Sequence, residues 1–270
     1  LLGFALGKPL LVRHCGNWAN ERTTAERFWK WFMERFAGGR NVMLATGGAS
    51  HPPSARNPNV SWIFSTSLRD ADLKKNRAAC ERTEPAPRLI IVCRQEHAKG
   101  TGVVIEALPI LAASMPGIHF DVVGGGGALP AFKALAARTG VSDRVTFHGA
   151  VGHQRVLELL RQAGLFCFPT ASSEGFPKAV LEAMSCGLPI VTTPVSVLPA
   201  LLAAGGGLLI EKASPDCVAG AVRHCLSDAG RYREMSRQAL LTAAGYSLER
   251  WRDTIAAMLV RHWKSDARPI

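Results

Sequence analysis

From Arg88 onward, short apolar runs alternate with amphipathic segments, and this alternation limits the fold more than any other feature of the chain. The apolar runs predict strands, and the segments between them carry apolar residues at helical spacing. Strands are expected near 89–93, 119–123, 145–148, 165–169 and 189–192, with helices near 102–113, 129–138, 153–163 and 178–186. Strands that alternate with helices form a parallel sheet covered by helices on both faces, so the sequence predicts an α/β fold.

The part of the chain before Arg88 has a weaker pattern of the same kind. Strands are expected near 8–13, 41–45 and 60–64, and a helix rich in Trp, Phe and Arg is expected near 23–36. Residues 65–87 are charged and end in Pro85-Ala86-Pro87, a composition that suggests an interdomain linker. Two or three further helices are expected to close the chain, near 215–227, 231–244 and 248–263.

One stretch of the second part combines two carboxylates with the start of a helix. The apolar run 165–168 precedes a polar loop that holds Glu174, and Pro177 stands in the expected first turn of a helix. Glu182 follows in that helix, eight positions after Glu174, and Gly187 ends it. The start of a helix binds anions such as phosphate, and carboxylates accept hydrogen bonds from ribose or sugar hydroxyls. The stretch therefore suits a nucleotide sugar, or else Glu174 is a helix cap and Glu182 a solvated charge.

The same stretch resembles the Glu-x7-Glu motif of glycosyltransferase family 4, whose members have the GT-B fold. The family typically shows E-G-F-P and then L-E-A-M-A-x-G-x-P-V-V, and the chain has E-G-F-P at 174–177 and L-E-A-M-S-C-G-L-P-I-V at 181–191. The resemblance implies two Rossmann-like domains that face a cleft. The first would be a partial, acceptor-side domain (1–84) and the second a nucleotide-sugar-binding domain (85–246), with a closing helix (247–270) packed back towards the first.

The resemblance also implies a chemistry and the residues for it. It implies a retaining transfer of a hexose, with the nucleotide sugar as substrate and no metal ion or cofactor. Glu182 would hold the ribose and Glu174 the hydroxyls of the sugar. Further donor contacts are expected at the start of the helix, from Gly175, Phe176, Pro177 and Lys178.

Two basic residues after the first strand of the second domain match another element of the family. Arg94 and Lys99 have the spacing of G-R-x-x-x-x-K-G, with Cys93 in place of the first glycine. In the family this pair contacts the diphosphate, and fixed cations there would stabilise the charge of the leaving group. The alternative is a solvated basic loop. The segment at 193–199 departs from the family's G-G-x-P-E element, so no donor contact is transferred to it.

A glycine run and three histidines complete the candidate residues. Gly124 and Gly126 follow an expected strand, but the G-x-G-x-x-G fingerprint of dinucleotide binding fails in both registers, so we interpret the run as a tight turn beside the donor. His14 lies in an R-H-C-G element that is loosely similar to an H-G element of the family. We expect it either to touch the transferred sugar or to be a structural hydrogen-bonding group. Structural roles are expected for His148 and His153.

The composition restricts the partners. The formal charge of +11 suits an anionic substrate or an anionic membrane, whereas few aromatic residues are interleaved with the basic ones and no nucleic-acid motif is present. The seven cysteines show no C-x-x-C pair, which favours reduced thiols in a cytoplasmic protein. No apolar run approaches the length of a membrane span. The basic, aromatic segment 27–32 is expected either to contact the inner face of an anionic membrane peripherally or to be a core face.

These features predict a glycosyltransferase with a glycan or lipid-linked acceptor, of the kind used in cell-surface polysaccharide or lipopolysaccharide synthesis. Two alternatives stay open: a module that binds a nucleotide sugar without catalysis, and a GT-B relative such as a sugar-nucleotide epimerase. First domains of the family are longer than 1–84 and open with strands and a Gly-rich loop without counterpart here. The chain is therefore expected to be a carboxyl-terminal portion of a larger enzyme.

Overall fold

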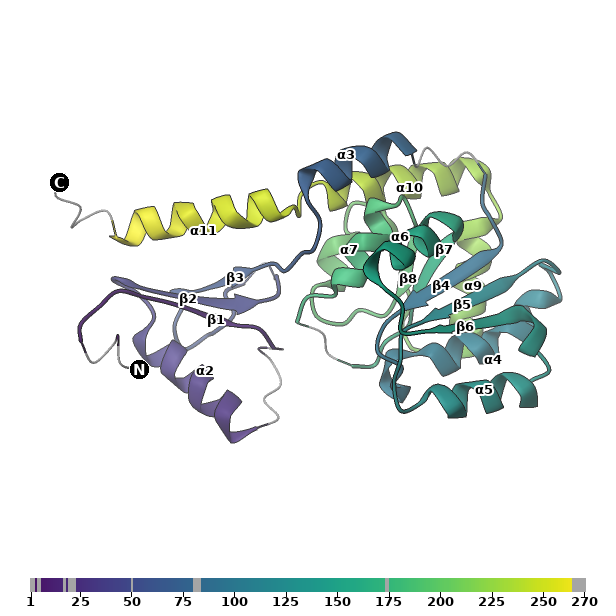
Figure 1. Ribbon diagram of the computed structural model, residues 1–270, viewed down its shortest axis with the longest axis horizontal. Helices are drawn as coiled ribbons and strands as arrows, with labels where there is room; N and C mark the ends of the chain where they lie inside the picture. The colour runs from purple at the N-terminus through teal and green to yellow at the C-terminus, as the bar shows by residue number, and fades with distance from the viewer. Residues whose placement is uncertain are drawn as a thin grey trace.

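The fold contains two parallel sheets, one in each half of the chain (Figure 1). A computed structural model describes residues 3, 6–16, 18, 23–49, 51–79, 84–172 and 175–263. The first sheet has the order β1-β2-β3 and the second the order β6-β5-β4-β7-β8-β9, and every strand pair is parallel. The predicted α/β fold is confirmed.

The second sheet begins at Arg88, where the alternation of the sequence begins. Its strands are β4 (Arg88–Val92), β5 (His119–Val123), β6 (Val145–Gly149), β7 (Leu165–Phe168), β8 (Ile190–Thr192) and β9 (Gly207–Leu209). Its helices are α4 (Thr101–Ala112), α5 (Leu129–Arg138), α6 (His153–Gln162), α7 (Lys178–Ser185), α8 (Leu198–Leu202), α9 (Pro215–Leu226) and α10 (Ala229–Ala243), and 3₁₀ turns form at His97–Lys99 and Ser142–Arg144. The predicted strands and helices of this half agree with these to within about two residues, but α8 and β9 were not predicted.

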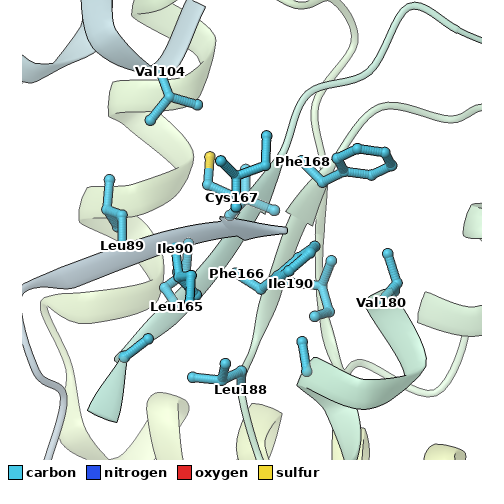
Figure 2. Close-up of a cluster of buried hydrophobic side chains, with 14 of the residues drawn as sticks. Leu89, Ile90, Val104, Leu165, Phe166, Cys167, Phe168, Val180, Leu188 and Ile190 are labelled. Carbon is cyan, nitrogen blue, oxygen red and sulfur yellow. The ribbon is translucent and has the colours of Figure 1, made fainter. Parts of the chain in front are cut away.

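The core of this half lies on both faces of the central strands. Figure 2 shows Leu165 and Phe166 of β7 among buried side chains, with Val104 of α4 and Val180 of α7 approaching from opposite sides. Because both faces are covered, these strands are continuous apolar runs without alternation. The buried thiol of Cys225 on α9 belongs to the same core, and burial raises its pKa to about 12.

The first sheet lies between two helices that come from opposite ends of the chain (Figure 1). It consists of β1 (Leu10–His14), β2 (Asn41–Thr46) and β3 (Val60–Ile63). On one face, α2 (Thr24–Phe36) buries Phe32 and Met33. On the other face, α11 (Leu248–Trp263) packs Trp251, Ile255, Met258 and Leu259 against Val42, Leu44 and Ile63.

The segment 65–87, predicted to be a linker, contains a helix. This helix, α3 (Asp70–Ala79), contacts α7, and Leu68 just before it is buried in the core of the second half. Asn76 on α3 donates to Ser185 Oγ on α7 at 3.1 Å and accepts from Arg161 on α6 at 2.9 Å. The helix was not predicted because the segment is mostly polar, with Leu73 of α3 packed against the core and Asn76 held by these polar contacts, so the sequence shows no apolar stripe.

Two segments connect the halves of the chain and contact each other, one just after β3 and the other just before α11. Phe64, just after β3, packs against Phe176 and Tyr246, with ring centroids 6.3 and 5.1 Å away. Further along, Leu248 N–H donates to Leu68 C=O at 2.8 Å. Burial raises the pKa of the Tyr246 hydroxyl. The two halves are thus joined by an aromatic cluster and by backbone hydrogen bonding.

Candidate active site

The candidate site lies where the order of the second sheet reverses. From β4 the chain continues outward to β5 and β6, whereas β7 pairs with the other side of β4 and continues to β8 and β9. Ligands of open α/β sheets bind at the carboxyl ends of the strands beside such a switch point. The loops after β4, β5 and β7 meet there: Gln95 N–H donates to Gly125 C=O at 2.9 Å, and Ala171 N–H to Ala98 C=O at 2.8 Å.

Glu182 presents a buried carboxylate at this place. It lies on α7 with 7% of its surface exposed, so the alternative of a solvated surface charge is rejected. Its Oε1 accepts hydrogen bonds from Ser67 Oγ and from His153 Nε2, the latter at 3.1 Å. Within the described part of the chain, Oε2 has no hydrogen-bond partner. One oxygen is therefore held by the protein while the other remains available.

The two residues that hold Glu182 come from different elements. His153 is the first residue of α6, and its contact with Glu182 puts it at the site, where only a structural role was expected. Ser67 precedes α3 and comes from the segment predicted to be a linker. No sequence signal pointed to Ser67, because a serine in a charged, loop-like stretch is ordinary.

The start of α7 offers backbone donors next to Glu182. Pro177 is the N-cap of α7, one position before the predicted place in the first turn, and Val180 N–H donates to Pro177 C=O at 3.1 Å. The N–H groups of Lys178 and Ala179 come before this first helical bond and lack an intrahelical partner. The side chain of Lys178 is exposed at the same end. Phe176 is buried in the aromatic cluster, so only its backbone can face a ligand.

Arg94 and Lys99 both belong to the loop that follows β4. Arg94 is mostly exposed, with its Nε 3.3 Å from Glu96 Oε1. Lys99 ends the 3₁₀ turn and precedes Gly100, whose φ of 89° is left-handed. A Cβ on Gly100 would lie 2.3 Å from Pro169 O, so a glycine is needed to bring this loop against the end of β7. Because an exposed ion pair is worth little, Arg94 can exchange Glu96 for another anion at low cost.

The glycine run after β5 allows a close approach between two loops. A Cβ on Gly124 would lie 1.9 Å from Cys93 O, and one on Gly126 would lie 2.3 Å from Gln95 O. The run is therefore a tight turn against the loop that carries Arg94. Gln95, which the sequence did not single out, is buried and donates from Nε2 to Val123 C=O at 3.0 Å. It helps to fix that loop.

The first sheet supplies the opposite wall of the site. A Cβ on Gly175 would lie 3.1 Å from Gly16 O, just after β1, and a Cβ on Gly48 would lie 3.1 Å from Val197 Cγ2. The carboxyl ends of both sheets therefore face each other. His14 is the last residue of β1, and its Nδ1 is buried without a hydrogen-bond partner among the described residues. Glu174 lies outside the described residues.

Three further expectations concern His148, a metal ion and a membrane span. His148 Nε2 donates to Asp121 Oδ1 at 2.8 Å, and Asp121 is fully buried beside the guanidinium of Arg88. This is the structural role that was expected for His148. The described residues hold no group of His, Cys, Asp and Glu side chains that could bind a metal ion. Nor does the described part of the chain contain a helix long and apolar enough to cross a membrane.

Known proteins with similar sequences and structures are glycosyltransferases. The GDP-mannose-dependent alpha-(1-6)-phosphatidylinositol monomannoside mannosyltransferase of Mycobacterium tuberculosis is 30% identical over 73% of this chain and 51% of its own length. The D-inositol 3-phosphate glycosyltransferase of Mycobacterium bovis is 34% identical over 72% of this chain and 41% of its own length. The chain thus spans about half the length of these relatives or less.

Two further comparisons concern the fold and the family. HepE of Anabaena, solved with UDP and glucose, superposes with a TM-score of 0.75 at 19% identity, covering 95% of this chain and 73% of HepE. This similarity concerns the fold alone. The sequence pattern of the family described as "Glycosyl transferases group 1" matches residues 72–241, which include the switch point and α7. Since this match spans more than half of the 270 residues, the chain belongs to the group 1 glycosyltransferases.

Proposed function

We propose that the protein transfers a hexose from a nucleotide sugar to a hydroxyl of a glycan or a lipid-linked acceptor, with retention of the anomeric configuration. The geometry of Glu182 is the observation that supports this proposal best. A buried carboxylate with Oε1 held by Ser67 and His153, and Oε2 without a partner among the described residues, suits a vicinal diol such as that of a ribose.

The diphosphate of the donor would lie between the loop after β4 and the start of α7. Arg94 and Lys99 come from one side of the switch point, and the N–H groups of Lys178 and Ala179 from the other. These groups would stabilise the negative charge that grows on the diphosphate as the bond to the sugar breaks. Arg94 can bind two phosphate oxygens at once, whereas Lys99 contributes a point charge.

The acceptor would approach from the first sheet, whose strand ends face the donor loops. In the proposed mechanism the acceptor hydroxyl attacks on the face from which the diphosphate departs, and no carboxylate has to act as a nucleophile. Glu174 would hold hydroxyls of the transferred sugar. The name of the Mycobacterium tuberculosis relative includes a phosphatidylinositol monomannoside, which supports a glycolipid as the acceptor.

We also propose that α2 contacts an anionic membrane. Its outer side exposes Trp31 and, on the flank, Phe28, with 52% and 43% of their surfaces accessible. Beside Trp31, a hollow of about 490 Å³ between α2 and the segment 53–56 is lined by the cations Arg27, Lys30 and Arg56. Glu34, the one acidic residue among the described lining residues, pairs with Arg56 at 3.5 Å. Exposed aromatic rings next to cations are the features by which an interfacial helix binds anionic lipid. Contact of this kind would bring the site to a lipid-linked acceptor.

Turnover of nucleotide sugars tests the proposed function. The full chain would be incubated with UDP- and GDP-hexoses, with and without glycan and glycolipid acceptors, and the release of nucleoside diphosphate would be followed. We expect release with at least one donor, and NMR of the product should show the anomeric configuration of that donor. Binding without release would favour the alternative of a donor-binding module, and conversion of the sugar without transfer would favour an epimerase.

A further inference from the structure

A segment from the first half of the chain holds α7, the helix of the donor site, at three places. We call this segment, 64–76, the connecting segment; Figure 1 shows it crossing from β3 to α3, and α3 contacts α7. Its three contacts lie just before α7 begins, in the middle of α7 and at the last residue of α7. The donor site is therefore supported from outside the second half, to which the proposed donor groups all belong.

The contact before α7 is made by three aromatic rings. Phe64, the first residue of the connecting segment, lies with its ring centroid 6.3 Å from that of Phe176. Tyr246 packs edge-to-face on Phe64 at 5.1 Å and lies 5.6 Å from Phe176, so each ring touches the other two. Phe176 is buried by these contacts, and rings from two other parts of the chain fix its position.

The position of Phe176 matters because α7 begins without a side-chain cap. Pro177 is the N-cap of α7, and its side chain has no group that could accept from the backbone N–H groups of the first turn. In contrast, α2, α9 and α10 each have such a hydrogen bond. The direction of the first N–H groups of α7 therefore depends on how the chain before the helix is held, and that chain is held at Phe176.

The other two contacts fix the middle and the end of α7. Ser67 Oγ donates to Glu182 Oε1, and Leu68, the next residue, is buried in the core of the second half. Asn76 Nδ2 donates at 3.1 Å to the hydroxyl of Ser185, which itself donates at 2.8 Å to the C=O of Glu182. These polar contacts hold the carboxylate that is proposed to bind the ribose, but they do not reach the start of the helix.

From these contacts we propose that Phe64 is a positioning residue for the diphosphate of the donor. Through Phe176 its ring holds the start of α7, so that the backbone N–H groups there point towards the phosphates. The inference rests on the proposed function, which places the diphosphate at the start of α7. The connecting segment then has two separate effects: Ser67 supports ribose binding through Glu182, and Phe64 supports phosphate binding without touching the ligand.

Titration of the full chain with ligands that differ only in their phosphates tests this inference. The probes are UDP, UMP and uridine and the corresponding guanosine series, measured by calorimetry and, for the nucleosides, by ligand-observed NMR. In Phe64→Leu we expect the dissociation constant of the diphosphate to rise about two- to tenfold, the size expected for losing an aromatic contact. The rise should be smaller for the monophosphate and absent for the nucleoside. Phe64→Tyr, which keeps the ring, should retain most of the affinity.

The variant Ser67→Ala should give a different pattern from Phe64→Leu. All three ligands of a series contain the ribose, so we expect Ser67→Ala to weaken each of them by the same factor. Trp251→Leu is a matched control, because Trp251 packs α11 against the first sheet and has no recorded contact with α7. It should leave every titration unchanged, and melting curves of all variants show that they are folded.

A double-mutant cycle shows whether Phe64 acts through Phe176. In a chain that already carries Phe176→Leu, we expect Phe64→Leu to lower the affinity for the diphosphate little further. Additive losses would mean that Phe64 acts by another route. A residue that only stabilised the fold would also weaken the binding of nucleoside and diphosphate alike, so the ligand series and the cycle together separate positioning from general stability.

Hydrogen exchange of the parent chain gives a readout that does not depend on the folding of any variant. Coupling between a ligand and the groups that position its site is reciprocal, so saturating diphosphate should slow exchange of the Tyr246 amide more than the nucleoside does. This amide donates to Ala243 C=O at 3.0 Å, next to the aromatic cluster.

Four results would overturn the inference while the donor site stands. They are an unchanged affinity for the diphosphate in Phe64→Leu, equal losses for diphosphate and nucleoside, additive losses in the double variant, and exchange at Tyr246 that the diphosphate does not slow. Absence of diphosphate binding to the parent chain would instead refute the proposed function, and the inference with it.

Discussion

Replacing Glu182 by alanine should weaken the binding of a nucleoside diphosphate, and the whole loss should come from the missing contact with the ribose. In the structure, Oε1 of Glu182 is occupied by Ser67 and His153, so the ribose diol would be bound chiefly through Oε2. Losing a hydrogen bond to a charged group costs roughly 1–3 kcal/mol, which corresponds to a dissociation constant about 5 to 150 times larger. Calorimetric titration of the parent chain and of Glu182→Ala measures this difference.

A ligand without the diol separates this role from a structural one. The same two proteins would be titrated with the 2′,3′-dideoxy form of the diphosphate, which completes a double-mutant cycle between Glu182 and the ribose. We expect Glu182→Ala to bind the dideoxy ligand as the parent chain does. Ser67→Ala should show a smaller loss with the ribose ligand only, because it leaves His153 in place to hold Oε1.

A matched surface variant controls for the change of charge. Glu158→Ala on α6 removes an exposed glutamate that pairs with Arg155 at 3.0 Å, and it should leave both titrations unchanged. Equal losses with the ribose and dideoxy ligands in Glu182→Ala would refute the reasoning, since the carboxylate would then support the fold of α7 without touching the ribose. An unchanged affinity for the ribose ligand would refute it as well.

Three further predictions concern the phosphates, the membrane and the first sheet. Arg94→Ala or Lys99→Ala should weaken the binding of the diphosphate far more than that of the bare nucleoside, and equal losses in calorimetry would place the pair away from the phosphates. The fraction of protein that co-sediments with liposomes should increase with the content of anionic lipid and should be smaller for Trp31→Ala. Binding that does not depend on lipid charge would exclude the proposed contact of α2. Amides of the first sheet should exchange hydrogen faster than those of β4, β5, β7 and β8, because β1 and β3 each have an unpaired outer edge among the described residues whereas these four strands are paired on both sides; comparable protection in both sets would contradict this.

The second half of the fold could be predicted because each of its elements has a local signature. Strands buried on both faces are apolar runs, and the helices between them show a periodic apolar pattern, so β4–β8 and α4–α7 were found close to their bounds. The strand β9 was missed because it is only three residues long and reads G-L-L after a glycine run. The helix α3 was missed because polar contacts from Asn76 hold it to α6 and α7.

Only those parts of the site whose residues lie close together in the sequence could be predicted. Glu182 and the start of α7 stand together in the chain, and the structure places them at the switch point of the sheet. Ser67 lies 115 positions from Glu182 and His153 lies 29 positions away, so neither contact leaves a local pattern. Contacts of this kind depend on how the halves of the chain pack, and single-sequence reasoning does not describe that packing.

Binding of nucleoside diphosphates to the full chain is the measurement that tests the central claim most directly. UDP and GDP would be titrated calorimetrically, together with the corresponding monophosphates and nucleosides. The account predicts saturable binding of at least one diphosphate at one site per chain, a clear loss of affinity with each phosphate removed, and competition by the matching nucleotide sugar. Absence of binding for every diphosphate, or equal affinity for diphosphate and nucleoside, would contradict a nucleotide-sugar site built from Glu182, Arg94 and Lys99.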